Sequence, residues 1–84
     1  MVTVKLFGVL RLETGMKELT AEAETVKALY PLVVREILAV KPDSAITEKA
    51  LRACLAAVNG VRVSPRTKLR DGDVVSFFPP AAGG

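Results

Sequence analysis

Apolar and polar residues alternate with a period of two near the start of the chain, which predicts β-strands. Residues 2–7 and residues 18–24 follow this pattern, and their short connection, with a helical turn around residues 10–12, predicts an antiparallel hairpin. Most of the outward positions of the second segment are acidic, as is typical of a protected edge strand: Glu18, Glu22 and Glu24.

A helical period replaces the alternation after Thr25, which is expected to cap the helix. Apolar residues recur there at spacings of three and four: Val26, Leu29, Tyr30, Val33, Ile37 and Val40. Pro31 removes one backbone hydrogen bond and is expected to kink the helix, and Pro42 is expected to end it. A short helical segment capped by Asp43 or Ser44 is expected next.

Three further strands are expected in the last part of the chain. Residues 53–63 contain Asn59-Gly60, the strongest short signal for a two-residue hairpin turn. A tight turn at Asp71-Gly72-Asp73 precedes the last strand, Val74 to Phe78. Strands before and after one long helix predict an α+β fold of the β-grasp (ubiquitin-like) type: a mixed sheet of about five strands with one main helix across one face.

Two aromatic residues are expected on the face of the sheet that the helix does not cover. In the last strand Val75 and Phe77 face the core, so Phe78 points outward, and Phe7 points outward from the first strand by the same alternation. If these strands pair, the two rings form an exposed patch, extended by Leu55 or Ala57. Because aromatic residues often anchor interfaces, we interpret the patch as a docking surface rather than as rings covered by a loop.

The composition excludes several classes of active site. The chain has 84 residues, no His, no Trp and one Cys, Cys54, so neither a Ser-His-Asp or Cys-His site nor a His-ligated metal site can be built. Cys54 lies on the inward side of its strand, as a small hydrophobic residue would. No signal peptide or membrane span is expected, and a lone Cys fits the reducing cytoplasm.

Basic residues are concentrated in one stretch of the chain. The 12 basic and 9 acidic residues give a net charge of +3. Six basic residues and no acidic ones lie between Glu48 and Asp71: Lys49, Arg52, Arg62, Arg66, Lys68 and Arg70. A nucleic-acid-binding module is one interpretation, but no aromatic residues interleave with the charges as a single-strand platform requires. A solvated face or a surface for an acidic partner is favoured.

The end of the sequence has the composition of a segment that threads a narrow channel. Beyond a β-grasp domain at residues 1–78, the flexible tail at residues 79–84 is Pro79-Pro80-Ala81-Ala82-Gly83-Gly84. The prolines stiffen its base, and six extended residues reach about 20 Å. Ala and Gly add almost no bulk, so the tail can deliver the Gly84 carboxylate into the active site of another protein.

Three segments resemble the MoaD-type small subunit of molybdopterin synthase, a branch of the ubiquitin-like sulfur carriers that also includes the thiamine carrier. They are Lys5-Leu6-Phe7-Gly8-Val9-Leu10-Arg11, Ala56-Ala57-Val58-Asn59-Gly60 and Leu69-Arg70-Asp71-Gly72-Asp73-Val74-Val75-Ser76-Phe77-Phe78-Pro79-Pro80 with the final Gly83-Gly84. The Phe-Phe-Pro-Pro element favours the molybdopterin type over the thiamine type.

The resemblance implies a mechanism in which the chain contributes no catalytic side chain and holds no permanent cofactor or metal. An E1-like adenylyltransferase uses ATP and Mg²⁺ to adenylate Gly84, and a sulfur donor protein converts the adenylate to a thiocarboxylate. The tail then enters the large subunit of molybdopterin synthase and donates sulfur to precursor Z. Gly83 gives clearance, and Phe7, Phe78 and the outward-facing Arg62 belong to the partner-binding surface. The alternatives are a sulfur carrier for thiamine or tRNA thiolation, and a ubiquitin-like modifier conjugated through Gly84.

Overall fold

Residues 1–80 are the part of the chain that this computed structural model describes, and they contain three helices and five strands. In chain order these are β1 (Val2–Leu6), α1 (Val9–Thr14), β2 (Glu18–Ala21), α2 (Val26–Val40), α3 (Glu48–Arg52), β3 (Leu55–Val58), β4 (Val61–Val63) and β5 (Val74–Phe78).

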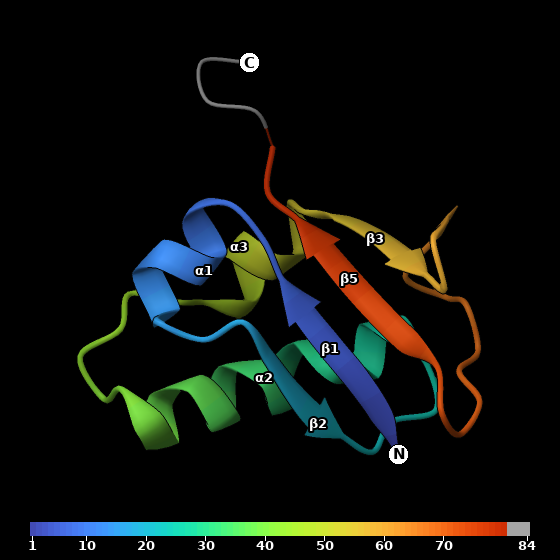
Figure 1. Ribbon diagram of the computed structural model, residues 1–84, viewed down its shortest axis with the longest axis horizontal. Coiled ribbons are helices and arrows are strands. Elements are labelled where there is room, and N and C mark those ends of the chain that lie inside the picture. The colour runs from blue at the N-terminus through green and yellow to red at the C-terminus, as the bar shows by residue number, and fades with distance from the viewer. Residues whose placement is uncertain (81–84) are drawn as a thin grey trace.

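The strands form one mixed sheet in the order β2-β1-β5-β3-β4 (Figure 1). The central pair, β1 and β5, is parallel, and every other neighbouring pair is antiparallel. α2 lies across one face of the sheet (Figure 1). This arrangement confirms the predicted β-grasp fold, and β2, with its exposed Glu18, is an edge strand as expected.

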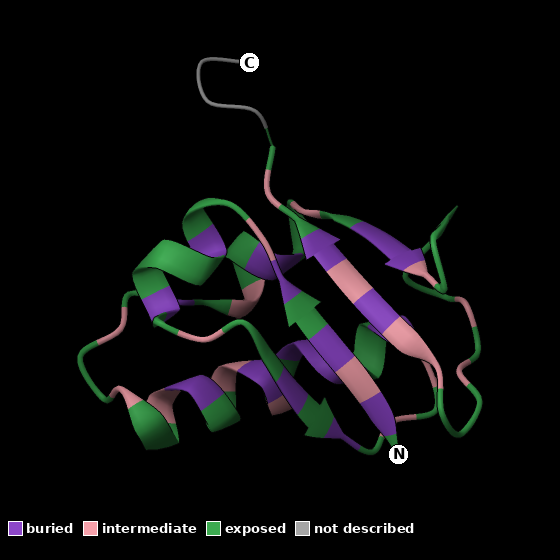
Figure 2. Ribbon diagram, in the orientation of Figure 1, coloured by how far each residue is buried: buried purple, intermediate pink, exposed green. Residues whose placement is uncertain are grey.

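The core lies between α2 and the sheet face that receives alternate strand residues. Buried and less buried residues alternate along β1 and β5 (Figure 2). Phe77 is the largest fully buried side chain, and its ring lies 5.9 Å from that of Tyr30 on α2. The other core residues of α2 follow the predicted helical spacing: Val26, Leu29, Val33 and Ile37. No helix in residues 1–80 covers the opposite face of the sheet (Figure 1).

The helix ends follow local capping chemistry. The Thr25 hydroxyl accepts a hydrogen bond from the Ala28 N–H at 3.2 Å, and Pro31 lies inside α2, which ends at Val40. The expected cap of the next helix at Asp43 or Ser44 was wrong, because the Ser44 hydroxyl accepts from the nearby Ile46 N–H and Thr47 caps α3 instead. None of the described helices has the length and apolarity needed to cross a lipid bilayer.

The turn at Asn59-Gly60 and the turn at residues 71–73 are joined by side-chain hydrogen bonds. Asn59 and Gly60 have φ values of 50° and 84°, as the predicted type I′ turn requires. Asn59 Nδ2 donates to Asp73 Oδ1 at 3.0 Å, and the Val74 N–H donates to Asn59 Oδ1 at 2.9 Å. The Arg70 N–H donates to Asp73 Oδ2 at 2.8 Å. The bond from Arg70 and then that from Asn59 lower the pKa of the Asp73 carboxyl.

Substitution Asp73→Asn is expected to destabilise the protein at neutral pH, and the difference from the wild type is expected to vanish in acid. An amide can replace only one of the two accepting oxygens. Because the pKa of Asp73 is lowered in the folded protein from a usual 3.8, its contribution is fully present above that value and is lost as the pH falls through the folded-state pKa. Thermal denaturation of both proteins from about pH 2 to pH 7 measures this. A difference that stays constant into acid would contradict the assignment.

Candidate functional site

The segment that leaves the sheet after β5 starts beside the end of β1. Their parallel pairing places Leu6 opposite Phe77, so the residues that follow β1 lie next to those that follow β5. Gly8 has a φ of +58°, and a Cβ there would lie 3.0 Å from Cγ of Pro79. Gly8 therefore allows the Pro79 ring to pack closely against the turn after β1, a contact that the sequence analysis missed.

The predicted tail is only partly covered by the described residues. Pro79 is half-buried and Pro80 is exposed. The remaining predicted tail residues lie outside the described residues: Ala81, Ala82, Gly83 and Gly84. Their roles, and the division into a domain at residues 1–78 and a tail at residues 79–84, stay predictions.

An aromatic stack lies on the open face of the sheet, beside the root of this tail. The ring centroids of Phe7 and Phe78 are 4.6 Å apart and their planes meet at 15°. Phe78 is 40% exposed, and Leu55, directly opposite it in β3, is 47% exposed. We call Phe7, Phe78 and Leu55 the aromatic patch. The predicted juxtaposition of the two rings is present, whereas Ala57 is buried and adds little to the surface.

Arg62 lies at the margin of the same face. It is exposed in the edge strand β4 and is paired with Ala57 in β3, which in turn is paired with Ser76 in β5. Two strand spacings, about 10 Å, therefore separate Arg62 from β5. The fold places Arg62 on the face of the aromatic patch without bringing it into the stack, and its partner-binding role stays a prediction.

Short helix α1 adds exposed apolar side chains close to the tail root. Val9 is 57% exposed and Leu12 is 82% exposed, while Leu10 between them is buried. These two side chains lie three positions apart and therefore share one face of the helix. The sequence analysis did not identify these two exposed side chains.

Cys54 has the surroundings of a structural thiol. It packs against the core, is partly buried, and its Sγ donates to the Ala50 carbonyl oxygen at 3.2 Å. Burial raises the pKa of this thiol, which disfavours the thiolate that acts as a nucleophile. The described residues thus present an exposed aromatic patch beside Pro79 and Pro80, with Cys54 as part of the framework.

Comparisons with known proteins agree with this geometry. Residues 4–84 match the model of the ThiS family. The chain is 37% identical over 86 residues to the molybdopterin synthase sulfur carrier subunit of Escherichia coli (strain K12), and the match covers 100% of both chains.

Solved structures with similar folds include complexes and single proteins. The complex of subunits 1 and 2 of molybdopterin-converting factor from Helicobacter pylori 26695 matches with a TM-score of 0.62 and 29% identity, covering 99% of this chain and 97% of that one. The small archaeal modifier protein 1 from Methanosarcina acetivorans matches with a TM-score of 0.74 and 28% identity, covering 99% and 95%.

Proposed function

This chain belongs to the ThiS family, and from that premise we propose that it is a sulfur carrier, the small subunit of a molybdopterin synthase. The observation that carries the proposal is the match to the Escherichia coli sulfur carrier subunit, which spans the whole of both chains. The aromatic patch beside the tail root supports it, because a carrier of this kind needs a docking surface next to the group that it delivers.

In this proposal the reactive group is the Gly84 carboxylate, and its activation takes two steps on partner proteins. An E1-like adenylyltransferase joins the carboxylate to the α-phosphate of ATP, with Mg²⁺ bound by the enzyme and pyrophosphate leaving. The adenylate is needed because a free carboxylate is a poor electrophile. A persulfide sulfur of the donor protein then attacks the carbonyl carbon and AMP leaves. A thiol reduces the resulting acyl disulfide and frees the thiocarboxylate.

Sulfur delivery takes place in the large subunit of the synthase. The aromatic patch docks on that subunit, and Pro79 and Pro80 direct the tail into its active site. There the thiocarboxylate sulfur adds to precursor Z, and two carrier turnovers build the dithiolene of molybdopterin. Gly83 provides clearance, and Ala81 and Ala82 keep the tail slender. We place the reaction in the reducing cytoplasm, where Cys54 needs no disulfide partner.

Intact mass spectrometry tests this function. The carrier is incubated with the E1-like enzyme and the sulfur donor from the same genome, with and without ATP. We expect an ATP-dependent mass increase equal to the replacement of one oxygen by sulfur, followed by its loss when the large subunit and precursor Z are added. A carrier that gains no sulfur under these conditions would refute the proposal. If the sulfurated carrier transfers sulfur only to a thiamine precursor or to tRNA, it belongs to that pathway and not to molybdopterin synthesis.

The similarity to the small archaeal modifier protein supports a second candidate, a ubiquitin-like modifier. In that case the activated Gly84 carbonyl would be attacked by a lysine amine of another protein, forming an isopeptide bond. The same incubation, with cell extract added, distinguishes the two functions. Persistent higher-mass conjugates without a thiocarboxylate form would favour the modifier.

A further inference from the structure

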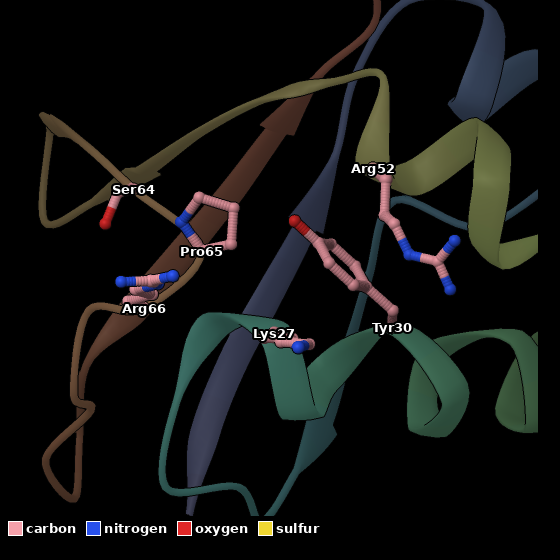
Figure 3. Close-up of a pocket in the computed structure, with 6 residues that line it drawn as sticks. All are labelled: Lys27, Tyr30, Arg52, Ser64, Pro65 and Arg66. Carbon is pink, nitrogen blue, oxygen red and sulfur yellow. The ribbon is translucent and has the colours of Figure 1, made fainter.

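Two adjoining cavities lie between α2, the end of α3 and the loop that follows β4. The first has a volume of about 330 Å³ and is lined by Lys27, Tyr30, Arg52, Ser64, Pro65 and Arg66 (Figure 3). We call it the basic pocket. The second, of about 510 Å³, shares four of these residues and extends past Cys54 to Arg62 in β4.

Basic residues from three separate segments of the chain line the basic pocket. Lys27 comes from α2, Arg52 from α3 and Arg66 from the loop after β4. Among the residues that the structure describes, no Asp or Glu lines either cavity. The nearest pairing is between Arg52 and Glu48, at 3.4 Å on the surface of α3, and such exposed pairs are weak. The pocket therefore offers uncompensated positive charge to an anion.

Tyr30 supplies a hydrogen-bond donor at the inner end of the pocket. The residue is 3% exposed, and its hydroxyl points into the pocket (Figure 3). None of the side-chain hydrogen bonds between described residues uses this hydroxyl. Burial raises the pKa of Tyr30, against an opposing effect of Arg52, so the hydroxyl keeps its proton at neutral pH. The exposed Pro65 ring supplies an apolar wall.

The loop that forms one side of the pocket is held in place by α2. The Lys27 N–H donates to the Pro65 carbonyl oxygen at 2.8 Å, and the Val26 N–H donates to the Thr67 carbonyl oxygen at 3.1 Å. These bonds satisfy N–H groups of the first helical turn, which have no partner within the helix itself. The side chains, rather than these N–H groups, are therefore the donors left for a ligand.

We propose that the basic pocket binds a phosphate ester that carries a planar aromatic group, such as a nucleoside monophosphate. The phosphate lies between Lys27 and Arg66, because ammonium and guanidinium groups give charge-assisted hydrogen bonds to phosphate oxygens. The aromatic group lies against the exposed Pro65 ring, beside the Tyr30 hydroxyl. The pocket volume is at the lower end of the range for small-molecule sites, which suits one nucleotide. This binding is separate from sulfur transfer and does not depend on it.

Backbone amide NMR titration of the full chain with AMP, GMP and CMP tests the proposal, with adenosine and inorganic phosphate as comparison probes at constant ionic strength. We expect at least one nucleotide to bind saturably, with a Kd on the order of 0.1–1 mM. The shifts should cluster at residues 27–30, 52–54 and 64–66. Inorganic phosphate and adenosine should each bind at least about tenfold more weakly than that nucleotide, because each makes only part of the contacts.

Matched charge variants locate the site. The pair Lys27→Ala and Arg66→Ala is expected to weaken nucleotide binding at least about tenfold, while Tyr30→Phe, which keeps the ring, should weaken it less. The control pair Lys49→Ala and Arg70→Ala removes the same charge from residues that line neither cavity, and should leave the Kd within about twofold.

Several outcomes would overturn the proposal. One is the absence of saturable binding for all three nucleotides. Another is inorganic phosphate that binds as tightly as the best nucleotide. A third is an equal loss of nucleotide affinity in the two double-alanine variants. A synthetic peptide of six glutamates that saturates the pocket more tightly than every nucleotide would also overturn it, and would assign the pocket to an acidic protein partner.

Discussion

Deletion of Gly84 is expected to abolish thiocarboxylate formation and sulfur transfer while leaving the fold intact. Removing one residue withdraws the terminal carboxylate by about 3.5 Å. Because misplacement by 1 Å can cost about a hundredfold in rate, we expect a loss of more than a hundredfold. Intact mass spectrometry after incubation with ATP, the E1-like enzyme and the sulfur donor measures thiocarboxylate formation. Release of molybdopterin by the reconstituted synthase measures sulfur transfer.

The matched control for this deletion is partner binding. Every described helix and strand precedes Pro79, and the aromatic patch is unchanged. The variant should therefore unfold at the wild-type temperature and bind the large subunit with near wild-type affinity. If it still transferred sulfur at a tenth of the wild-type rate or faster, the assignment of the reaction to Gly84 would be wrong.

Replacement of the neighbours Phe77 and Phe78 by alanine is expected to separate folding from partner binding. Phe77 is fully buried against Tyr30, so Phe77→Ala should cost about 3–5 kcal/mol of unfolding free energy. That is a large part of the 5–15 kcal/mol or so that stabilises a typical domain. Phe78 stacks on Phe7 at the surface, so Phe78→Ala should cost at most about 1.5 kcal/mol. It should nevertheless lower the affinity for the large subunit at least about tenfold.

Urea denaturation and calorimetric titration against the large subunit separate these effects. If Phe77→Ala does not fold, Phe77→Leu keeps much of the apolar volume and should show a smaller loss in the same direction. If Phe78→Ala binds the large subunit with wild-type affinity, the aromatic patch is not part of the interface. A loss of stability in Phe78→Ala as large as that in Phe77→Ala would mean that both rings serve the core.

The parts of the fold that depend on short-range pattern could be predicted from the sequence. Strict alternation in β5 assigns Phe77 and Phe78 to opposite faces, and Asn59-Gly60 identifies the β3–β4 hairpin through backbone conformation alone. The stacking of Phe7 on Phe78 needed one further assumption, that their strands pair. The β-grasp fold predicted from the order of the strands and the helix supplied this assumption, and the parallel register of β1 and β5 bears it out.

Features that depend on contacts between distant segments could not be predicted in this way. The fit of Pro79 against Gly8 arises only when β1 and β5 pair, and neither residue signals it locally. The basic stretch was visible in the sequence, but Lys27 lies outside it, and only packing brings Lys27 to Arg66. The cap of α3 was misassigned because several hydroxyl and carboxylate residues precede the helix, and local propensity alone does not choose among them.

The position of β5 in the centre of the sheet links complete synthesis of the chain to presentation of the proposed reactive end. β5 is the last strand described, yet it fills the gap between β1 and β3 and contributes the buried Phe77. During translation β1 and β3 therefore cannot be joined into one sheet until β5 has been synthesised. A ribosome that stops short of β5 leaves a product without a closed core, which cellular proteases can remove. Any copy that persists as a folded domain has consequently been synthesised as far as the root of the tail.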